Sequence, residues 1–68
     1  MVNLIQLFTD AYGGITDKDA AKILPVTPGC ISNWRSGKFP INEFSEYCIK
    51  LHLEISQSHR DRIKERYL

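Results

Sequence analysis

The sequence lacks any long apolar run, since its longest uninterrupted apolar stretches are only a few residues. A membrane-spanning helix needs about 20 such residues, so we expect no membrane span. The N-terminus lacks a basic region followed by an apolar core and a cleavage site, so we expect no secretory signal. Strand-like alternation, internal repeats and low-complexity stretches are also missing. These absences favour a helical domain over a sheet or a repeat array.

Cysteine is scarce, with only Cys30 and Cys48 in the chain. A secreted domain of this size usually carries a denser disulfide framework, so we expect two reduced, buried thiols in a cytoplasmic protein. Cys48 and His52 are four residues apart on a predicted helix, and Cys30 with His59 could complete four metal ligands. Burial explains the two thiols better, because Cys48 belongs to an apolar stripe and Cys30 precedes an apolar residue. We therefore expect no metal and no cofactor.

An enzyme is not expected either. A cysteine nucleophile with a histidine base is conceivable from the residue types alone. Nothing in so small a helical chain supplies a substrate pocket or an oxyanion hole. The sequence thus predicts no catalytic residue and no small-molecule ligand.

The chain also lacks a large surplus of one charge, because its formal net charge is +1. Nucleic-acid binders usually carry a basic surplus. The charge is nevertheless segregated along the chain. Residues 1–19 hold one lysine and three aspartates, whereas residues 20–42 hold Lys22, Arg35 and Lys38 with no acid. The middle of the chain is therefore the part best suited to an anionic partner.

The length of 68 residues, 43% of them hydrophobic, allows one compact core and no second domain. We expect a single domain over residues 1–68. A chain this short buries only about 60% of the surface that its unfolded form exposes, so self-association is plausible. The apolar candidates for a dimer surface are Leu53, Ile55, Ile63, Tyr67 and Leu68.

Two helices are predicted before residue 25. Leu4, Phe8 and Tyr12 repeat at helical spacing and predict a first helix over residues 3–12, ended by two glycines. Thr16 is a good N-cap for a second helix, with an acid three residues later as in a capping box. That helix ends near Leu24, because the proline that follows disfavours helical backbone before it.

The third helix has the clearest start and stop signals. Thr27 can cap orphan amides, and Pro28 suits the first helical position, where no donor is lost. Val26 and Ile31 have the spacing of a hydrophobic staple. Gly37 supplies the left-handed residue that ends the helix.

Two more helices follow. Asn42 can cap a fourth helix, and Ser56 or Ser58 can cap a fifth that reaches Tyr67. The fourth helix carries the clearest apolar stripe of the chain, which consists of Phe44, Tyr47, Cys48, Leu51 and Ile55.

The second and third helices, separated only by Pro25 and Val26, predict a helix-turn-helix over about residues 16–37. Ala21 is small where the two helices approach each other, and Ile31 and Trp34 face the core. The outward side of the third helix is short and free of acids. Its residues are Thr27, Pro28, Gly29, Ser32 and Asn33.

The segment from Asp17 to Gly37 resembles the helix-turn-helix of phage Cro and repressor proteins. The residues that fit the family pattern are Ala21, Val26, Thr27, Ile31, Ser32, Trp34, Arg35 and Gly37. Two positions depart from it. Pro25 stands where the family usually has glycine, so the turn must be built differently. Asp17 stands where the family often has a glutamine that touches phosphate, so that contact is not carried over.

The resemblance implies an all-α, four- to five-helix domain of the lambda-repressor-like type. It implies a repressor that binds double-stranded operator DNA as a homodimer in the cytoplasm of a bacterial host, with half-sites about 34 Å apart. The expected base contacts are Thr27, Pro28, Gly29, Ser32 and Asn33. The expected phosphate contacts are Arg35, Ser36 and Lys38 by the resemblance, with Lys22 added for its charge.

Two other functions stay open at this point. A helical protein-interaction module, such as an antirepressor or adaptor, could keep the same shape and present the third helix to a protein. An architectural or excision factor could bend DNA without a palindromic site.

Overall fold

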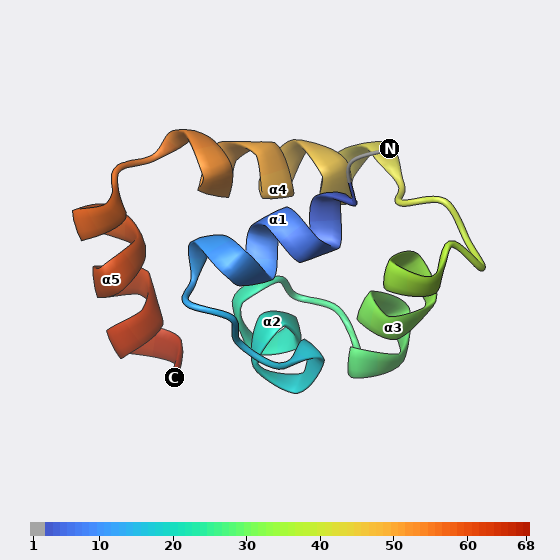
Figure 1. The fold of residues 1–68 in the computed structure, drawn as a ribbon, viewed down its shortest axis with the longest axis horizontal. Helices are drawn as coiled ribbons and strands as arrows, with labels where there is room; N and C mark the ends of the chain where they lie inside the picture. The colour runs from blue at the N-terminus through green and yellow to red at the C-terminus, as the bar shows by residue number, and fades with distance from the viewer. Residues whose placement is uncertain (1–2) are drawn as a thin grey trace.

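The computed structural model describes residues 3–68, whose regular secondary structure consists of helices alone (Figure 1). The elements are α1 (Leu4–Ala11), α2 (Asp17–Ile23), α3 (Pro28–Ser36), α4 (Glu43–Glu54) and α5 (Gln57–Tyr67). The predicted all-α class is therefore confirmed, with five helices where four to five were expected. None of the helices in residues 3–68 combines the length and the apolar character needed to cross a membrane.

Each helix begins behind a polar residue whose side-chain oxygen accepts a backbone N–H of the first turn. These residues are Asn3, Thr16, Thr27, Asn42 and Ser56. Such a bond satisfies one of the amide groups that a helix start leaves unpaired, and losing it costs about 1 kcal/mol. The predicted caps at Thr16, Thr27 and Asn42 are confirmed, and Ser56 caps α5.

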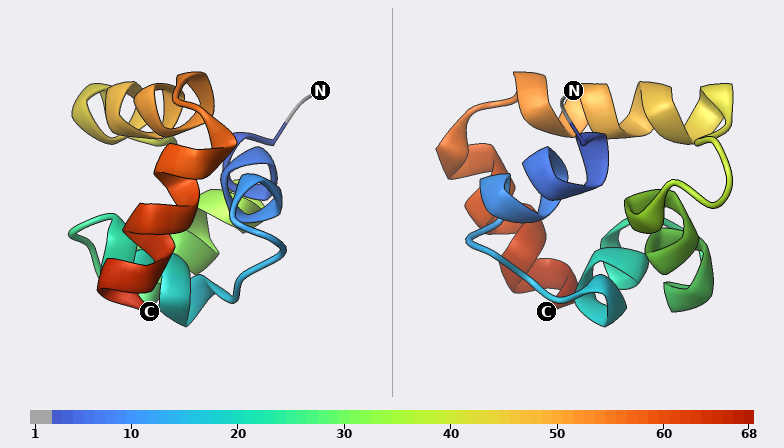
Figure 2. Two further views of the ribbon diagram at one scale, coloured as in Figure 1. Left: turned by 90° about the vertical axis from the view of Figure 1, so that its left-hand side faces the viewer. Right: turned by 45° about the vertical axis from the view of Figure 1, so that its right-hand side comes forward.

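The helices form two levels with α5 at one end. In Figure 1, α4 lies along α1 in the upper level, while α2 and α3 pack together beneath α1. The two turned views in Figure 2 show α5 descending from the end of α4 and packing against α2. Between the levels is a small apolar core made of Ile5, Phe8, Tyr12, Ala20, Ile23, Leu24, Ile31 and Ile49.

The rotation of α4 differs from what its apolar stripe suggests. The residues that α4 buries are Ser45 and Ile49, whereas Phe44 and Tyr47 are 70% and 61% exposed and Leu51 is 43% exposed. Each helical residue turns by about 100°, so Ile49 lies roughly 140° around the helix from Phe44. Packing against α1 through Ile49 therefore turns most of the stripe outward.

Arg60 joins α5 to the end of α4. Its Nη1 donates to the backbone oxygens of His52 (3.0 Å) and Ile55 (2.7 Å), and less closely to that of Leu53. These carbonyls lie in the last turn of α4 and just beyond it, where a cation is favourable. No residue of α5 is fully buried, so this cap is a principal attachment of the last helix.

Candidate nucleic-acid interface

The connection between α2 and α3 is a tight turn that needs no left-handed residue. Leu24 leaves α2 with φ −88° and ψ 129°, and the Val26 amide donates to the Leu24 oxygen at 2.7 Å. This i to i+2 bond is the mark of a γ-turn around Pro25, a turn for which the fixed φ of proline is suitable. No residue other than glycine has a positive φ among residues 3–68. The turn is thus built without the glycine that the family pattern would place there.

Both ends of α3 are fixed by local hydrogen bonds. The Thr27 hydroxyl accepts the Cys30 amide at 3.3 Å, with proline in the first helical position as predicted. At the other end Gly37 has a φ of +78°, and the Lys38 amide donates to the Asn33 oxygen at 3.0 Å. Together with the Gly37 amide bond to the next carbonyl, this is a Schellman ending. The helix therefore has defined limits independent of any partner.

The predicted base-contacting residues lie at the surface of the protein. Thr27, Pro28, Gly29 and Ser32 are exposed, and Asn33 is partly buried. We call these five residues the α3 face. In the right-hand view of Figure 2, α3 lies at the edge of the molecule beside α2. The inward side of α3 is held by Ile31, which is fully buried, and by Trp34, which is partly buried against the core.

Gly29 keeps the α3 face flat. A Cβ atom at this position would have the Thr27 hydroxyl oxygen as its nearest neighbour, at 3.8 Å, which is an ordinary contact. The fold therefore has room for a side chain at position 29. Packing therefore does not require glycine at position 29, and the missing side chain affects only the shape of the surface.

Three of the four predicted phosphate contacts are exposed, namely Lys22, Ser36 and Lys38. The Lys22 ammonium lies 3.8 Å from an Asp19 carboxylate oxygen, a loose pair at the surface. The Lys38 ammonium lies 5.8 Å from the centre of the Phe39 ring, which is itself 53% exposed. Both lysines are accessible to an anionic partner.

Arg35, the fourth predicted phosphate contact, forms hydrogen bonds with other side chains of the protein. Its Nε and Nη2 donate to one Asp17 carboxylate oxygen at 3.0 and 2.8 Å. Its Nη1 donates to the Gln6 amide oxygen at 2.6 Å, and Nη2 also approaches the Thr9 hydroxyl at 3.3 Å. Arg35 thus links α3 to both α1 and α2. The signal for this pairing was the aspartate at position 17, where the family pattern has glutamine.

The prediction that both thiols are buried is wrong for Cys30, which is exposed, and Cys48 is partly buried. Cys30 is next to Ile31, and one residue's rotation of about 100° carries its side chain out of the core. Among residues 3–68, no three histidine, cysteine, aspartate or glutamate side chains lie together as metal ligands would.

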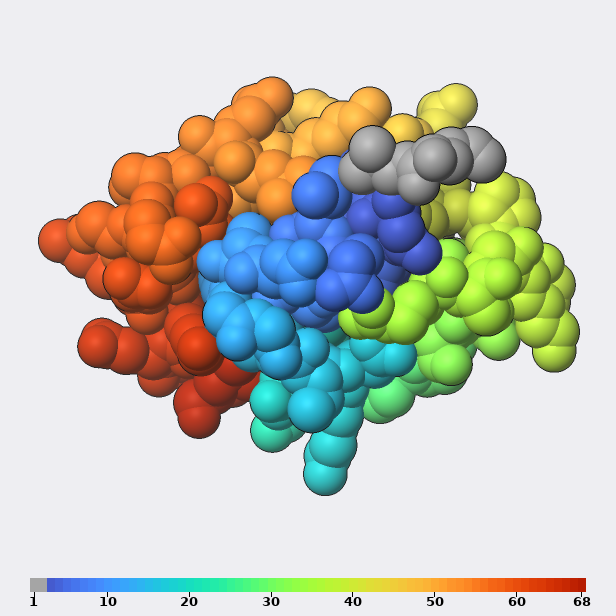
Figure 3. Space-filling view, viewed as in Figure 1, coloured from blue at the N-terminus to red at the C-terminus, as the bar shows by residue number. Residues whose placement is uncertain are grey.

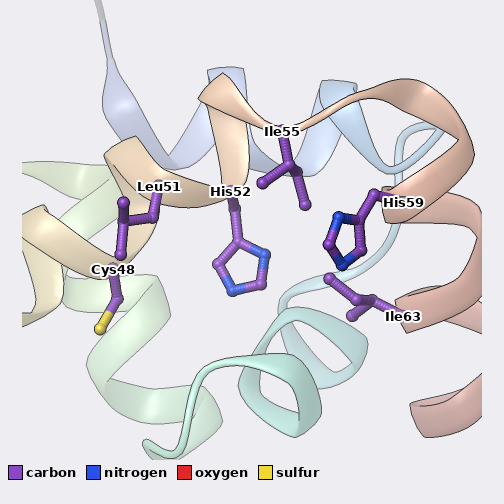
Figure 4. Close-up of a pocket in the computed structure, with 6 residues that line it drawn as sticks. All are labelled: Cys48, Leu51, His52, Ile55, His59 and Ile63. Carbon is purple, nitrogen blue, oxygen red and sulfur yellow. The ribbon is translucent and has the colours of Figure 1, made fainter.

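A second surface feature lies on the other side of the molecule from α1, between α4 and α5. It is an open, largely apolar pocket of about 190 Å³. Figure 4 shows the imidazole rings of His52 and His59 and the side chain of Ile63 directed toward a common space. The complete lining is Cys48, Leu51, His52, Ile55, His59 and Ile63.

His52 also contacts the edge of the apolar core. Its Nδ1 shares a hydrogen bond with the Tyr12 hydroxyl, which reaches it from α1. Burial lowers the pKa of His52 below its usual value, and the positive charge of Arg60 lowers it further. Burial raises the pKa of Tyr12, and the same arginine opposes that rise. The lowered pKa of His52 and the raised pKa of Tyr12 both favour the neutral forms of these side chains.

Two surfaces thus stand out, the α3 face with the exposed Lys22 and Lys38, and the apolar side of α4 with its pocket. Figure 3 shows the face of the molecule where α1 fills the centre and α3 and α5 lie at opposite edges. Comparisons with models of protein families, with curated proteins and with solved structures find no match to this chain.

Proposed function

We propose that this protein is a sequence-specific DNA-binding transcriptional regulator, a Cro-like repressor that binds operator DNA as a homodimer. In this proposal α2 and α3 form a helix-turn-helix, and the α3 face enters the major groove. One observation carries it: the α3 face is uncharged and, apart from the partly buried Asn33, exposed, on a helix whose two ends are fixed. A face of this kind can lie against base pairs without desolvating a charge.

The residue types on the α3 face suit base edges. The Asn33 amide can donate to and accept from adenine at once, which is worth about 1–3 kcal/mol of discrimination. The Thr27 methyl and the Pro28 ring suit the methyl group of thymine. Gly29 allows close approach of the helix, and the free amides at the start of α3 favour a phosphate nearby.

Phosphate neutralisation falls to few residues in this proposal. Lys22 and Lys38 supply the positive charge and Ser36 a neutral donor, while Arg35 is left out because Asp17 and Gln6 hold its guanidinium. Two lysines per copy give a dimer about four neutralised phosphates. The logarithm of the binding constant should then fall with the logarithm of salt concentration with a slope of about −4.

The test is a titration of labelled DNA that has been selected for binding from a random pool. We expect Asn33→Ala to lose about 1–3 kcal/mol per half-site of the preference for the selected site over scrambled DNA. We expect Lys38→Ala to weaken binding to both DNAs equally and to reduce the steepness of the salt slope by about two in a dimer, one per copy.

Arg62→Ala is the matched control for charge. It removes one exposed positive charge from α5, away from α3, and should leave both affinity and salt slope nearly unchanged. Equal losses for Asn33→Ala and Lys38→Ala on both DNAs would contradict the roles assigned here. A selected site without a palindrome, together with induced curvature of the DNA, would favour an excision factor instead.

A protein-interaction module is the second candidate, and the internal position of Arg35 favours it because it reduces the positive charge around the α3 face. The two candidates differ in their response to bulk DNA and salt. Binding that bulk DNA competes away, and that falls steeply from low to moderate salt, supports the regulator. A partner retained under both conditions supports the module.

A further inference from the structure

The last helix, α5, is the helix least embedded in the protein. Each of the other helices of residues 3–68 buries at least one side chain, whereas α5 buries none. Its contribution beside the core is Ile63, which is partly buried, and its Tyr67 is 49% exposed. A segment with so little buried apolar surface can open at a lower free energy than the rest of a fold.

The start of α5 is attached to α4 by polar bonds. Two residues with extended backbone, Ile55 and Ser56, join the two helices. Beyond them, Arg60 donates through Nη1 to the backbone oxygens of His52 and Ile55. Its Nη2 donates to the Gln57 amide oxygen at 3.1 Å. A helix leaves its last carbonyls without partners of its own, so Arg60 supplies donors that α4 lacks and fixes the angle between the two helices.

The remainder of α5 lies against α2. In Figure 1, α2 lies between α3 and α5, and it packs against both. Besides Ile63, the residues of this part of α5 are charged or exposed. The Lys64 ammonium lies close to Gly13, where an added Cβ atom would come within 3.2 Å of it. Because apolar burial is the dominant favourable term in packing, Ile63 supplies most of what holds this part of α5 in place.

The rest of the fold does not take its core from α5. In the described part of the chain, every buried member of the apolar core precedes α5, the last being Ile49 in α4. The helix α1 packs against α3 and α4, and α3 packs against α2. Arg35 joins α3 to α1 and α2 through its hydrogen bonds with Gln6 and Asp17. These contacts are made without α5, so they remain when α5 moves away.

We propose that α5 is a detachable strap, which swings away from α2 about Ile55 and Ser56 while α1–α4 remain folded. The two linking residues absorb the change in φ and ψ, as hinge residues do. Arg60 is the residue that keeps the strap docked. Detachment removes one of the two helices between which α2 lies, so the strap controls how firmly α2 is held. This inference goes beyond the proposed function, and its test uses no DNA.

The first experiment is hydrogen exchange of the native protein, followed amide by amide by NMR. We expect the amides of residues 61–67 to share one protection factor, at least about tenfold below the highest in α1 and α4, because α5 opens as one unit. Protection that instead falls steadily toward Leu68 would indicate fraying of the helix end and would overturn the proposal.

Ile5→Val separates the strap from the rest of the fold, because Ile5 is fully buried in the core. Losing one methyl group there should lower the protection of α1 and α4 about two- to tenfold. The protection of α5 should stay unchanged, since Ile5 remains packed when α5 detaches. A loss shared equally by α5 would show that α5 opens only when the whole protein unfolds, which would overturn the proposal.

The second experiment compares Arg60→Met with Arg62→Met, which removes an exposed arginine of the same helix. Arg60→Met should lower the protection of residues 61–67 about tenfold or more, because hydrogen bonds from a charged group are lost. Helices α1 and α4 should lose at most the same factor, since complete unfolding includes detachment. Arg62→Met should change neither. An Arg60→Met protein whose α5 is protected as in the wild type, or one that unfolds entirely, would overturn the proposal.

Discussion

The Arg35 side chain connects three helices. Its guanidinium donates to Asp17 at the start of α2 and to Gln6 and Thr9 on α1. The backbone oxygen of Arg35 accepts the side-chain amide of Asn3 at 3.0 Å. The side chains of Arg35 and Asp17 are each 31% exposed. A charge-assisted pair that is partly shielded from water contributes more than the usual pair at an open surface.

Replacing Arg35 with Met should therefore lower the free energy of unfolding by about 1–2 kcal/mol, measured by urea denaturation. Lys22→Met is the control, because the Lys22–Asp19 pair is long and open to solvent. Its effect should stay within about 0.5 kcal/mol. In a double-mutant cycle with Asp17→Asn, a coupling energy near zero would show that the arginine contributes through packing alone.

The third helix serves both the fold and the proposed interface, and the two roles can be separated at its glycines. Gly37 occupies the left-handed region at +78°, where a Cβ atom is unfavourable. Gly29 lies inside the first turn with helical backbone and free space for a Cβ atom. The backbone requires a glycine at position 37, whereas nothing within the fold requires one at position 29.

We expect Gly29→Ala to leave the free protein as stable or up to about 1 kcal/mol more stable, because alanine is the better helix former. The same substitution should weaken binding to the selected DNA site, since it adds a methyl group to the α3 face. Gly37→Ala should instead destabilise the fold by about 1–2 kcal/mol. Thermal denaturation and the DNA titration together check both. Unchanged DNA binding by Gly29→Ala would argue against close approach at that position.

At the scale of the whole molecule, α1, α4 and α5 meet at Tyr12, His52 and Arg60. The Tyr12 ring packs against the His52 ring with their centres 5.6 Å apart, in addition to the hydrogen bond. Arg60 approaches from α5 and bonds the backbone oxygen of the same histidine. Because a positive guanidinium and burial both oppose protonation of His52, the junction should respond to pH.

The direction of that response follows from the lowered pKa of His52. The unfolded chain binds a proton near the ordinary value of 6.5, and the folded protein binds it only at lower pH. Between these two values the unfolded state holds more protons, so stability decreases as pH falls below about 6.5. We expect the urea midpoint to decrease between pH 7.5 and pH 5.

His52→Gln should remove most of that decrease, whereas His59→Gln, the control, should keep it. His59 lines the same pocket but is exposed and takes no part in the hydrogen bonds that join His52 to Tyr12 and Arg60. Comparing the variants separates the contribution of His52 from that of every other group in the chain. A pH dependence equal in the wild type and in His52→Gln would show that another group is responsible.

The sequence by itself determined the helices and their ends. Thr16, Thr27 and Asn42 each bond an amide three residues away, and Gly37 ends α3 through bonds within the same turn. Such contacts depend only on neighbours in the chain, so residue types and spacing predict them. The exposure of the α3 face followed similarly, because Ile31 fixes the inward side of that helix.

Only the tertiary structure decided which side of α4 is buried and what Arg35 binds. An apolar stripe shows that a helix has an apolar face, but whether the core or a surface receives it depends on the shape of α1 beneath. Arg35 meets partners 18 and 29 residues away, and no local spacing specifies such a pairing. These contacts are selected when the helices pack, because burial and charge pairing then act between segments that are distant in the chain.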